Sequence, residues 1–464
     1  MVSPKTLPDD ALQRRDALKV MGAAAVAALL PESAASQPAS RPNMVFIMAD
    51  DLGYADLSCY GRRDYATPEI DRLAREGLIM TQAYSNSAVC SPTRIALMTG
   101  RYHQRLRGGL EEPIKWPDPE LGLPPAHPTL PFLLRTSGYS TALVGKWHMG
   151  WPPQFGPLRS GYDRFFGIVA GAADYVSHRP NLPDREGEIA LYEGDEPVRR
   201  TGYMTDILAD HALSELRTAA ASRKPFLLSL HFNAPHWPWQ APGDPAIPRT
   251  TRDLWHRDGG SLKTYGKMVL AMDAAVGRVM AELEALGLAG NTIVIFTSDN
   301  GGERFSDMWP LRGSKGELLE GGIRVPQIVR WPGRIRAGTE SRQVMATMDW
   351  LPTLLAAAAT EPDEAFPPDG VNLLDVLTGA APPRPRKLFW RFRENGQAAV
   401  RDGDWKYLRI EGQEFLFDIP QDPRERTDLK AASPAVFDRL RSEYESWAET
   451  MLPYPASEAA APTG

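Results

Sequence analysis

The feature of this sequence that most restricts its fold is a series of short apolar runs that end abruptly in polar residues. Asn43–Ala49 (NMVFIMA) is followed directly by Asp50 and Asp51, and the other runs end in a similar way. Continuous apolar runs of this length are typical of strands that are buried on both faces of a parallel sheet. Because open α/β sheets bind ligands at the carboxyl ends of their strands, we expect the functional site at that edge. The runs are Asn43–Ala49, Ser140–Val144, Phe226–Phe232 and Thr292–Ser298.

Helical signals separate these runs and complete the pattern of an α/β protein. Pro68 stands where the first turn of a helix would begin, and Gly77 closes that segment. Thr264–Leu286 has the apolar spacing of a helix, and Gly100 ends a shorter one. A further strand is expected at Leu78–Tyr84. Strands that alternate with helices predict a mixed or parallel sheet that is covered by helices on both faces.

Beyond about residue 380 the pattern changes to short segments in which apolar and polar residues alternate. Asp402 and Gly403 lie between two of these segments and are typical of a hairpin turn. We therefore expect a small antiparallel sheet, then a helix at Pro434–Met451 and a disordered tail. This divides the chain into a main domain at residues 41–380, a C-terminal subdomain at 381–455 and a tail at 456–464. The alternating segments are Lys387–Arg393, Gln397–Arg401, Trp405–Ile410 and Glu414–Asp418.

The first 40 residues differ from the rest of the chain and have the order of an export signal. Arg14 and Arg15 precede an apolar stretch at Val20–Leu30, and small residues follow at Ser33–Ser36. The paired arginines resemble a twin-arginine signal, and the apolar stretch is shorter than the about 20 residues that a membrane span needs. We expect residues 1–35 to be removed and the mature protein to be periplasmic or secreted, with no stable membrane anchor. The alternative is an amphipathic helix of the mature fold.

Composition excludes several other classes of protein. The chain has 464 residues, and its 58 acidic residues against 52 Lys and Arg give a formal charge of −6, which argues against a nucleic-acid partner. A hydrophobic content of 43% is enough for a packed core and excludes disorder as the main state. The two cysteines, Cys59 and Cys90, exclude a disulfide framework, and Cys59 is expected to be a buried structural thiol.

The acidic residues at the strand ends are the first candidates for chemistry. Asp50 and Asp51 end one strand, and Asp299 and Asn300 end another strand much later in the chain. Neighbouring carboxylates repel each other, so grouping them is favourable when a cation lies between them. Oxygen ligands of this kind suit Ca²⁺ or Mg²⁺. Each pair taken alone is more typical of a turn or a helix cap than of a metal site.

Cys90 opens the segment CSPTR at the predicted start of a helix, where free N–H groups and the helix dipole favour anions. A lone cysteine is usually a small buried hydrophobe. The pattern Cys-x-Pro-x-Arg, however, resembles the signature of the type I sulfatase family, in which this cysteine is oxidised to formylglycine. Further blocks over about residues 42–350 resemble the same family and occur in its order. They are Asn43–Gly53 (NMVFIMADDLG), Thr99–Tyr102, Gly145–Gly150 (GKWHMG), Ala234–His236, Ser298–Gly301 (SDNG) and Leu311–Pro326 (LRGSKGELLEGGIRVP).

The resemblance implies a fold, an activity and a site. The fold is the alkaline-phosphatase-like α/β fold, a mixed sheet between helices with a smaller C-terminal antiparallel sheet plus helix, and residues 41–380 become the catalytic domain. The activity is that of a sulfatase that hydrolyses a sulfate monoester of a small molecule or a carbohydrate. The implied ligands of one divalent metal, usually Ca²⁺ with Mg²⁺ as the alternative, are Asp50, Asp51, Cys90, Asp299 and Asn300. The implied catalytic residues are Cys90, Arg94, Lys146, His148, His236 and Lys315.

The resemblance also implies a role for each catalytic residue. Modified Cys90 is the nucleophile, and Arg94 and His148 hold it in place. One hydroxyl of the aldehyde hydrate attacks sulfur, and the second expels sulfate as the aldehyde forms again. His236 is the acid for the leaving oxygen, and His148 is the base for the second step. A formylglycine-generating maturation enzyme is the implied partner. The groups that contact the sulfate are Lys146, Lys315 and His236.

Two other functions stay open from the sequence. The nearer one is a formylglycine-dependent phosphonate or phosphodiester hydrolase of the same fold. The other is a carbohydrate-binding protein without catalysis, or an enzyme whose cysteine stays unmodified; the intact set from Asp50 to Lys315 argues against it. The substrate itself is not predicted, and the segments expected to set specificity are Leu106–Ala126 and Val169–Arg200.

Several residues outside the motifs receive no firm role. His178 and His211 lie in a stretch without family blocks. Trp237 and Trp239 flank the His236 motif and suit a substrate mouth as well as simple packing.

Overall fold

The computed structural model describes residue 1 and residues 41–180, 189–248 and 259–455. The predicted signal at residues 1–35 and the predicted tail at 456–464 lie outside the described residues, so both stay predictions. Among the helices of the described ranges, none combines the length and the apolar character that crossing a membrane requires.

The centre of the fold consists of the apolar runs that the sequence predicts as strands. β1 (Asn43–Ala49) lies between β8 (Phe226–His231) and β9 (Thr292–Ser298) and runs parallel to both. Every residue of β1 is buried, as expected for a strand that is covered on both faces. β4 (Ser140–Lys146) pairs in parallel with the other side of β8. The four predicted strands are therefore confirmed, and their carboxyl ends lie at one edge of the sheet.

Shorter strands extend this sheet and make it mixed. The order of its described strands is β11-β2-β10-β9-β1-β8-β4-β5-β6-β7. β10 is antiparallel to β9, and β6 is antiparallel to β5, whereas β5 is parallel to β4. The added strands are β2 (Leu78–Met80), β5 (Arg164–Ile168), β6 (Leu191–Glu193), β7 (Glu196–Pro197), β10 (Gln327–Arg330) and β11 (Thr339–Ser341).

The single strand predicted at Leu78–Tyr84 is wrong, because the structure divides this segment between two sheets. β2 belongs to the central sheet, whereas β3 (Ala83–Tyr84) pairs with β12 (Met345–Ala346) in a separate two-stranded sheet. The polar residues Thr81 and Gln82 form a turn between them. Their backbone groups bond to Ser341 and Met345, so the chain changes partner at this point.

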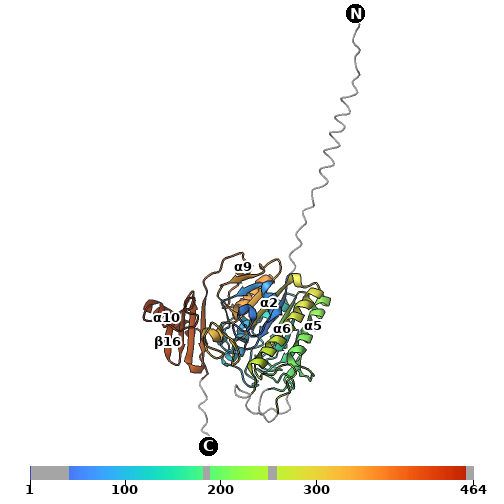
Figure 1. Ribbon diagram of the computed structural model, residues 1–464, viewed down its shortest axis with the longest axis horizontal. Helices are drawn as coiled ribbons and strands as arrows, with labels where there is room; N and C mark the ends of the chain where they lie inside the picture. Colours follow the sequence, from blue (N-terminus) through green and yellow to red (C-terminus); the bar gives the residue numbers. More distant parts are fainter. Residues whose placement is uncertain (2–40, 181–188, 249–258, 456–464) are drawn as a thin grey trace. The chain divides into compact units, whose positions relative to one another are not determined.

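Helices cover the two faces of the central sheet. One face packs against α2 (Pro68–Arg75), α5 (Met204–Ser222) and α6 (Leu262–Ala285), which lie side by side (Figure 1). The other face packs against a second group of helices. Alternate residues of β1 serve the two cores, because Val45 and Ile47 join the first and Phe46 joins the second. The second group is α3 (Cys90–Thr99), α4 (Leu130–Thr136), α8 (Trp350–Ala357) and α9 (Leu374–Leu377).

Short helical turns complete the part of the chain that is described. α7 is a single turn at Glu320–Ile323. Cys59, which the sequence analysis expects to be buried, lies in the first 3-10 turn, packs against the first core and is half-buried. The 3-10 turns are η1 (Ser58–Tyr60), η2 (His103–Arg105), η3 (Arg107–Leu110), η4 (Pro157–Ser160), η5 (Ala289–Asn291), η6 (Thr347–Asp349) and η7 (Glu394–Gly396).

A four-stranded antiparallel sheet follows near the C-terminus, as the alternating segments predict. Its strand order is the chain order, and Gly403 adopts a left-handed conformation (φ 57°) in the hairpin turn after Asp402. α10 (Pro434–Glu449) packs against this sheet (Figure 1). The strands are β13 (Lys387–Phe392), β14 (Gln397–Asp402), β15 (Trp405–Ile410) and β16 (Gln413–Asp418).

A buried group of charges joins this small sheet to the rest of the chain. Lys406 on β15 lies 3.0 Å from Glu320 Oε1 on α7 and 2.8 Å from Glu425 Oε1. All three side chains are fully buried. The Lys406 ammonium and the Arg324 guanidinium hold the pKa of Glu320 at about 2 against the effect of burial. Lys406 therefore keeps a carboxylate ionised inside the protein.

Replacing Lys406 by methionine is expected to destabilise the protein by about 3–5 kcal/mol, because it leaves the Glu320 carboxylate buried without its strongest cation. Chemical denaturation of the purified variant measures the loss. Lys387→Met is the matched control, because the Lys387–Glu443 pair is about one-third exposed and its loss is expected to cost less than about 1 kcal/mol. Equal stability of the two variants would contradict the assigned role of the buried group.

Candidate active site

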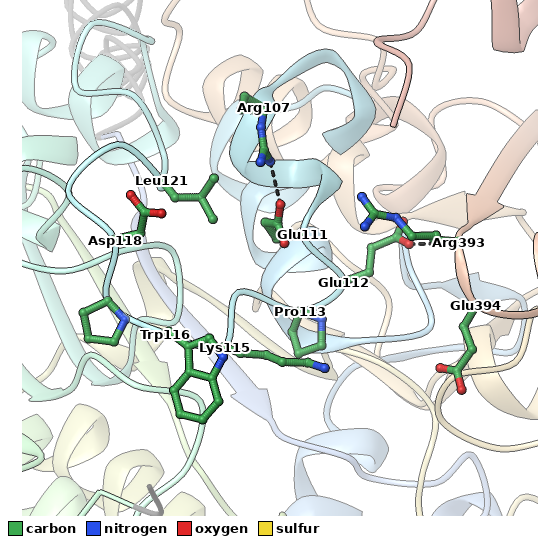
Figure 2. Close-up of a pocket in the computed structure, with 11 residues that line it drawn as sticks. Arg107, Glu111, Glu112, Pro113, Lys115, Trp116, Asp118, Leu121, Arg393 and Glu394 are labelled. Carbon is green, nitrogen blue, oxygen red and sulfur yellow. Dashed lines mark hydrogen bonds and ion pairs between the residues drawn. The ribbon is translucent and has the colours of Figure 1, made fainter. Parts of the chain in front are cut away.

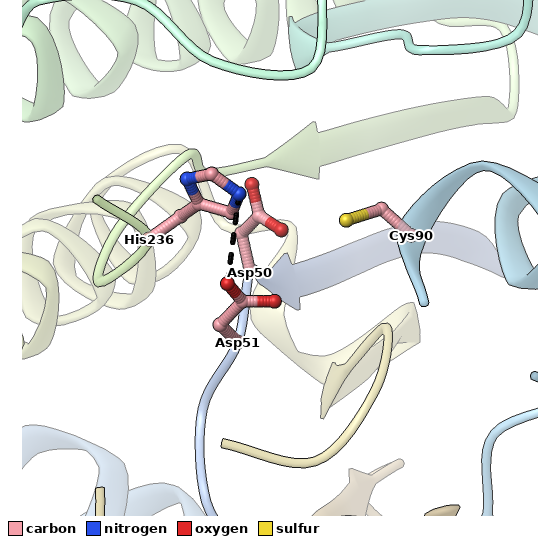
Figure 3. A group of neighbouring side chains, drawn as sticks. All are labelled: Asp50, Asp51, Cys90 and His236. Carbon is pink, nitrogen blue, oxygen red and sulfur yellow. Dashed lines mark ion pairs between the residues drawn. The ribbon is translucent and has the colours of Figure 1, made fainter. Parts of the chain in front are cut away.

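The polar residues at the strand ends meet at one edge of the central sheet. Asp50 and Asp51 follow β1, and His236 lies in the turn after β8. α3 begins at Cys90 and points its first residue at them. One potential ligand atom from each of Asp50, Asp51, Cys90 and His236 lies within 4.8 Å of the others, and all four residues are buried (Figure 3).

Three carboxylates of the site are each paired with a cation. Lys146 Nζ at the end of β4 lies 2.6 Å from Asp50 Oδ2. Lys315 Nζ lies 2.7 Å from Asp51 Oδ2. The structure thus brings both predicted lysines to the predicted metal ligands, and the lysines face carboxylates where the resemblance expects them to face sulfate.

Arg94 forms the third pair. Its Nη2 donates to Asp299 Oδ2 at 2.8 Å, and its Nε donates to the same oxygen at 3.1 Å. Its Nη1 also donates to the carbonyl oxygen of Lys146. Arg94 lies in the second turn of α3 and is fully buried. Its charge-assisted hydrogen bonds therefore hold Asp299 and the end of β4 in place.

Three of the four predicted oxygen ligands, Asp51, Asp299 and Asn300, form one hydrogen-bonded group. Asn300 Nδ2 donates to Asp51 Oδ1 at 2.7 Å, and the backbone N–H of Asp51 donates to Asp299 Oδ1 at 3.3 Å. Asp51 has a left-handed backbone (φ 62°), a strained conformation that turns its side chain toward the others. Residues from two strand ends that are far apart in sequence therefore converge, as the sequence predicts.

This group fits a hard divalent cation. Within the described part of the chain, Asp50 Oδ1 and Asn300 Oδ1 are buried and have no hydrogen-bond partner. Burial, together with the nearby Asp299 carboxylate, raises the pKa of Asp50 to about 8. Buried oxygens without partners are unfavourable unless something coordinates them. Carboxylate and amide oxygens are the ligands that Ca²⁺ and Mg²⁺ prefer.

Cys90 is held rigidly at the start of α3. Its side chain is buried, and burial raises the pKa of its thiol to about 12. The hydroxyl of the next residue, Ser91, accepts a hydrogen bond from the backbone N–H of Ile114 at 2.9 Å. The loop around Ile114 therefore packs directly beside the predicted nucleophile.

Backbone hydrogen bonds fix the proton on each predicted catalytic histidine. His148 Nε2 lies 2.8 Å from the carbonyl oxygen of Ile114, so this nitrogen carries the proton and Nδ1 carries the lone pair. That Nδ1 is buried without a partner among the described residues. His236 is oriented in the opposite sense, because its Nδ1 donates to the carbonyl of Trp237 and its Nε2 lies 3.5 Å from Asp51 Oδ2.

Two further polar residues at the end of β8 belong to this neighbourhood and were not predicted. His231 Nδ1 lies 3.5 Å from Arg94 Nη1, so it faces the residue that orients Asp299. Asn233 is buried, and neither polar atom of its side chain has a partner within the described ranges. The rule that polar residues at strand ends form the site would have found Asn233, which directly follows the predicted run Phe226–Phe232, whereas His231 lies inside that run.

The residues without a predicted role have structural positions. His178 Nε2 bonds to the carbonyl of Gly202, and the His211 ring stacks on Phe166 at 3.4 Å. Trp237 and Trp239 are both buried in the first core, so packing is the reading that the structure favours for them.

Comparisons with known proteins agree with this geometry. A family model described as Sulfatase matches residues 42–360, and a model described as N-sulphoglucosamine sulphohydrolase, C-terminal, matches residues 314–446. The chain is 33% identical over 468 residues to N-acetylgalactosamine-6-sulfatase from Sus scrofa, with 89% of this chain and 86% of the relative covered. It is also 33% identical over 473 residues to human arylsulfatase A, with 89% of each covered.

A solved structure shares the fold along most of the chain. The crystal structure of Ps i-CgsB in complex with k-i-k-neocarrahexaose has a TM-score of 0.77 and 31% sequence identity, and the match covers 88% of this chain and 93% of that one. The range matched by the Sulfatase family model, residues 42–360, includes Asp50, Cys90 and Lys315.

Proposed function

Because this chain belongs to the sulfatase family and is a sulfuric ester hydrolase, we propose that it removes sulfate from sulfated carbohydrates through a formylglycine formed at Cys90 and one divalent cation. The observation that carries the proposal is the convergence of Asp50, Asp51, Cys90 and His236 within 4.8 Å at the carboxyl edge of the sheet. The carboxylates of this group offer ligands to a cation. The two lysines, each within 2.7 Å of one of these carboxylates, supply the positive charge that a sulfate group requires.

The residues that would hold the cation are Asp50, Asp51, Asp299, Asn300 and the modified Cys90. When bound, the cation supplies Lewis-acid polarisation of a sulfate oxygen and positive charge beside the nucleophile. Formylglycine, once hydrated, supplies one hydroxyl to attack sulfur and a second to expel sulfate. A maturation enzyme that oxidises Cys90 is part of the proposal.

The protein's own side chains bind and orient the sulfate. Lys146 is the last residue of β4 and Lys315 lies in a turn, and the two bring fixed ammonium groups to the same space. Such preorganised charge stabilises the developing negative charge in the transition state more than it stabilises the ground state. Arg94 keeps Asp299 and the end of β4 in position while the reaction proceeds.

The histidines move protons at defined atoms. The lone pair on His148 Nδ1 can accept a proton, because its Nε2–H is committed to the Ile114 carbonyl. Burial, with Lys146 nearby, lowers the pKa of His148, so the ring is neutral and ready to act as a base. His236 presents Nε2 to the cluster, and because its Nδ1–H is committed to the Trp237 carbonyl, Nε2 must first take up a second proton before it can protonate the leaving oxygen.

Sulfated carbohydrate is the substrate class that the relatives support. The pig relative is named for N-acetylgalactosamine 6-sulfate, and the Ps i-CgsB structure contains a carrageenan-type oligosaccharide by its name. Both match along most of this chain. A sulfated sugar is therefore a better first substrate for this protein than a simple aryl sulfate, which serves as a convenient test compound.

The alternative is a phosphonate or phosphodiester hydrolase of the same fold, and the preference between sulfate and phosphate separates the two. We expect kcat/KM for p-nitrophenyl sulfate to exceed that for p-nitrophenyl phosphate by at least about tenfold, which corresponds to about 1.4 kcal/mol. The reason is the charge of the substrate. A sulfate monoester carries one negative charge and suits a single cation site with two lysines. A phosphate monoester carries close to two negative charges and suits a site with a second metal. Both substrates are measured on one preparation in which mass spectrometry shows the Cys90 modification. Equal rates, or faster phosphate hydrolysis, would favour the alternative.

A further inference from the structure

A second feature of the fold is a surface pocket of about 550 Å³ beside the C-terminal sheet. One wall is the segment from Arg107 to Leu121, which lies inside a loop that the sequence analysis expects to set specificity. The opposite wall is Arg393 and Glu394, at the end of β13 (Figure 2). The pocket therefore lies between the catalytic domain and the small antiparallel sheet.

The segment that lines this pocket also contacts the active site. Pro113 and Lys115 line the pocket, and Ile114 between them is buried. The carbonyl oxygen of Ile114 accepts a hydrogen bond from His148 Nε2 at 2.8 Å. The backbone N–H of Ile114 donates to the hydroxyl of Ser91, the residue after Cys90, at 2.9 Å. The segment that lines this pocket therefore also contacts His148 and the residue next to Cys90, through Ile114.

An exposed aromatic ring lines the pocket. The Trp116 side chain is 55% exposed, which is unusual for a residue of this size. Figure 2 shows Trp116 beside Lys115 on one wall of the pocket and Glu394 on the other. An indole face with polar groups beside it suits a sugar ring, because the apolar face of the ring packs on the indole while its hydroxyls bond to the polar groups.

The charges that line the pocket nearly cancel. Arg107 is paired with Glu111 at 2.6 Å, and Arg393 stacks on the ring of Tyr454. Glu112 accepts hydrogen bonds from the Arg393 backbone N–H and from the Tyr454 hydroxyl. Overall, three basic side chains face four acidic ones. This balance gives no net attraction for an anion.

Two lining groups are free to bond to a ligand. Lys115 and Glu394 form no ion pair with another described residue. An ammonium donor and a carboxylate acceptor that line the same pocket can bond to different hydroxyls of one sugar, one hydroxyl accepting and the other donating. A sulfate on the same sugar would gain from Lys115 but would be repelled by the nearby carboxylates.

From these observations we propose that the pocket is a subsite for an uncharged sugar next to the sulfated one, with Trp116 as its platform and Lys115 and Glu394 as its hydrogen-bonding groups. This rests on the proposed function, because it names the part of the substrate that lies beyond the reacting sulfate. The preferred substrate is then an oligosaccharide that carries sulfate on one unit and none on the next.

Three probes and one variant test the subsite. The probes are N-acetylgalactosamine 6-sulfate, the disaccharide that links its anomeric carbon to unsulfated galactose, and the same disaccharide with a sulfate on the galactose. We expect the wild type to show a kcat/KM for the singly sulfated disaccharide about tenfold above those for the other two. Trp116→Ala is expected to remove this preference. Trp309→Ala, which replaces a tryptophan that is 62% exposed in a different pocket, is expected to keep it.

Binding measurements separate this proposal from the proposed activity. Calorimetry with Cys90→Ala, alone and combined with Trp116→Ala, measures the same preference without turnover. If the wild type hydrolyses no sulfate ester, the proposed function fails, yet a tenfold binding preference that Trp116→Ala removes still supports the subsite. The subsite is overturned if Trp116→Ala keeps the preference, if the two disaccharides and the monosaccharide are equivalent, or if the doubly sulfated disaccharide is preferred.

Discussion

Replacement of Cys90 by alanine is expected to lower kcat for p-nitrophenyl sulfate by at least about 10⁴-fold, the scale on which loss of a nucleophile is felt. The protein is expected to stay folded, because alanine is smaller than cysteine and suits the first turn of α3. Initial rates give the loss of activity, and a cooperative thermal transition shows that the fold is kept. Cys59→Ala is the matched control, since Cys59 lies at the edge of the core away from the strand ends.

Serine at position 90 gives a sharper test of the chemistry. Its hydroxyl can attack sulfur, but the sulfated serine has no second oxygen on the same carbon with which to expel the sulfate. We expect at most one product molecule per enzyme and a sulfated protein by intact mass. Sustained turnover by Cys90→Ser would rule out a mechanism that depends on an aldehyde hydrate.

The central strands were predictable from sequence because their signal is local. Each of β1, β4, β8 and β9 is a continuous apolar run that both faces of the sheet bury, so the run itself marks the strand. The C-terminal strands were predictable for the opposite reason, since one covered face imposes strict alternation. Lys387–Phe392 shows this alternation directly in its burial.

The edge strands and several helices were not predicted, because their stability comes from contacts that are distant in sequence. β10 has four residues and is defined by antiparallel pairing with β9 and β2. α5 is a long helix rich in small residues, so its apolar face is weakly marked in the sequence. The segment Leu78–Tyr84 is divided between two sheets because β2 pairs with β11 and β3 pairs with β12. No local sequence pattern encodes these pairings.

The site shows the same limit at the level of single residues. The motifs identify Lys146 and Lys315. The sequence does not show that they pair with Asp50 and Asp51, because these pairs form only when distant parts of the chain meet in the fold. The tautomers of the two histidines that are predicted to be catalytic depend on the carbonyl groups of Ile114 and Trp237, and the sequence does not show that these groups lie nearby. The sequence therefore predicted which residues meet at the strand ends, whereas it did not predict which nitrogen of each histidine carries the proton.

The pairing of lysines with carboxylates leads to a prediction about metal removal. Because Lys146 and Lys315 already neutralise Asp50 and Asp51, the metal-free protein is expected to stay folded. The same lysines are then engaged with carboxylates and are less available to a sulfate. We therefore expect chelator treatment to abolish hydrolysis of p-nitrophenyl sulfate while a cooperative thermal transition remains at a lower temperature, and Ca²⁺ to restore both the activity and the transition temperature.

Asp51→Asn tests the same cation site through the protein. It removes one formal charge that faces the cation, and we expect activity to fall at least about 100-fold, the upper end of the losses seen when only an outer-shell partner of a metal is removed. Asp210→Asn is the control, because Asp210 is an exposed carboxylate on α5 that pairs with Arg278 at the surface. Measuring the calcium content per protein together with activity tests whether the loss of activity follows the loss of calcium. Full activity in enzyme shown to be free of metal would refute the cation site. Bound calcium with normal affinity in an inactive Asp51→Asn would instead place Asp51 in sulfate positioning, through its contact with Lys315.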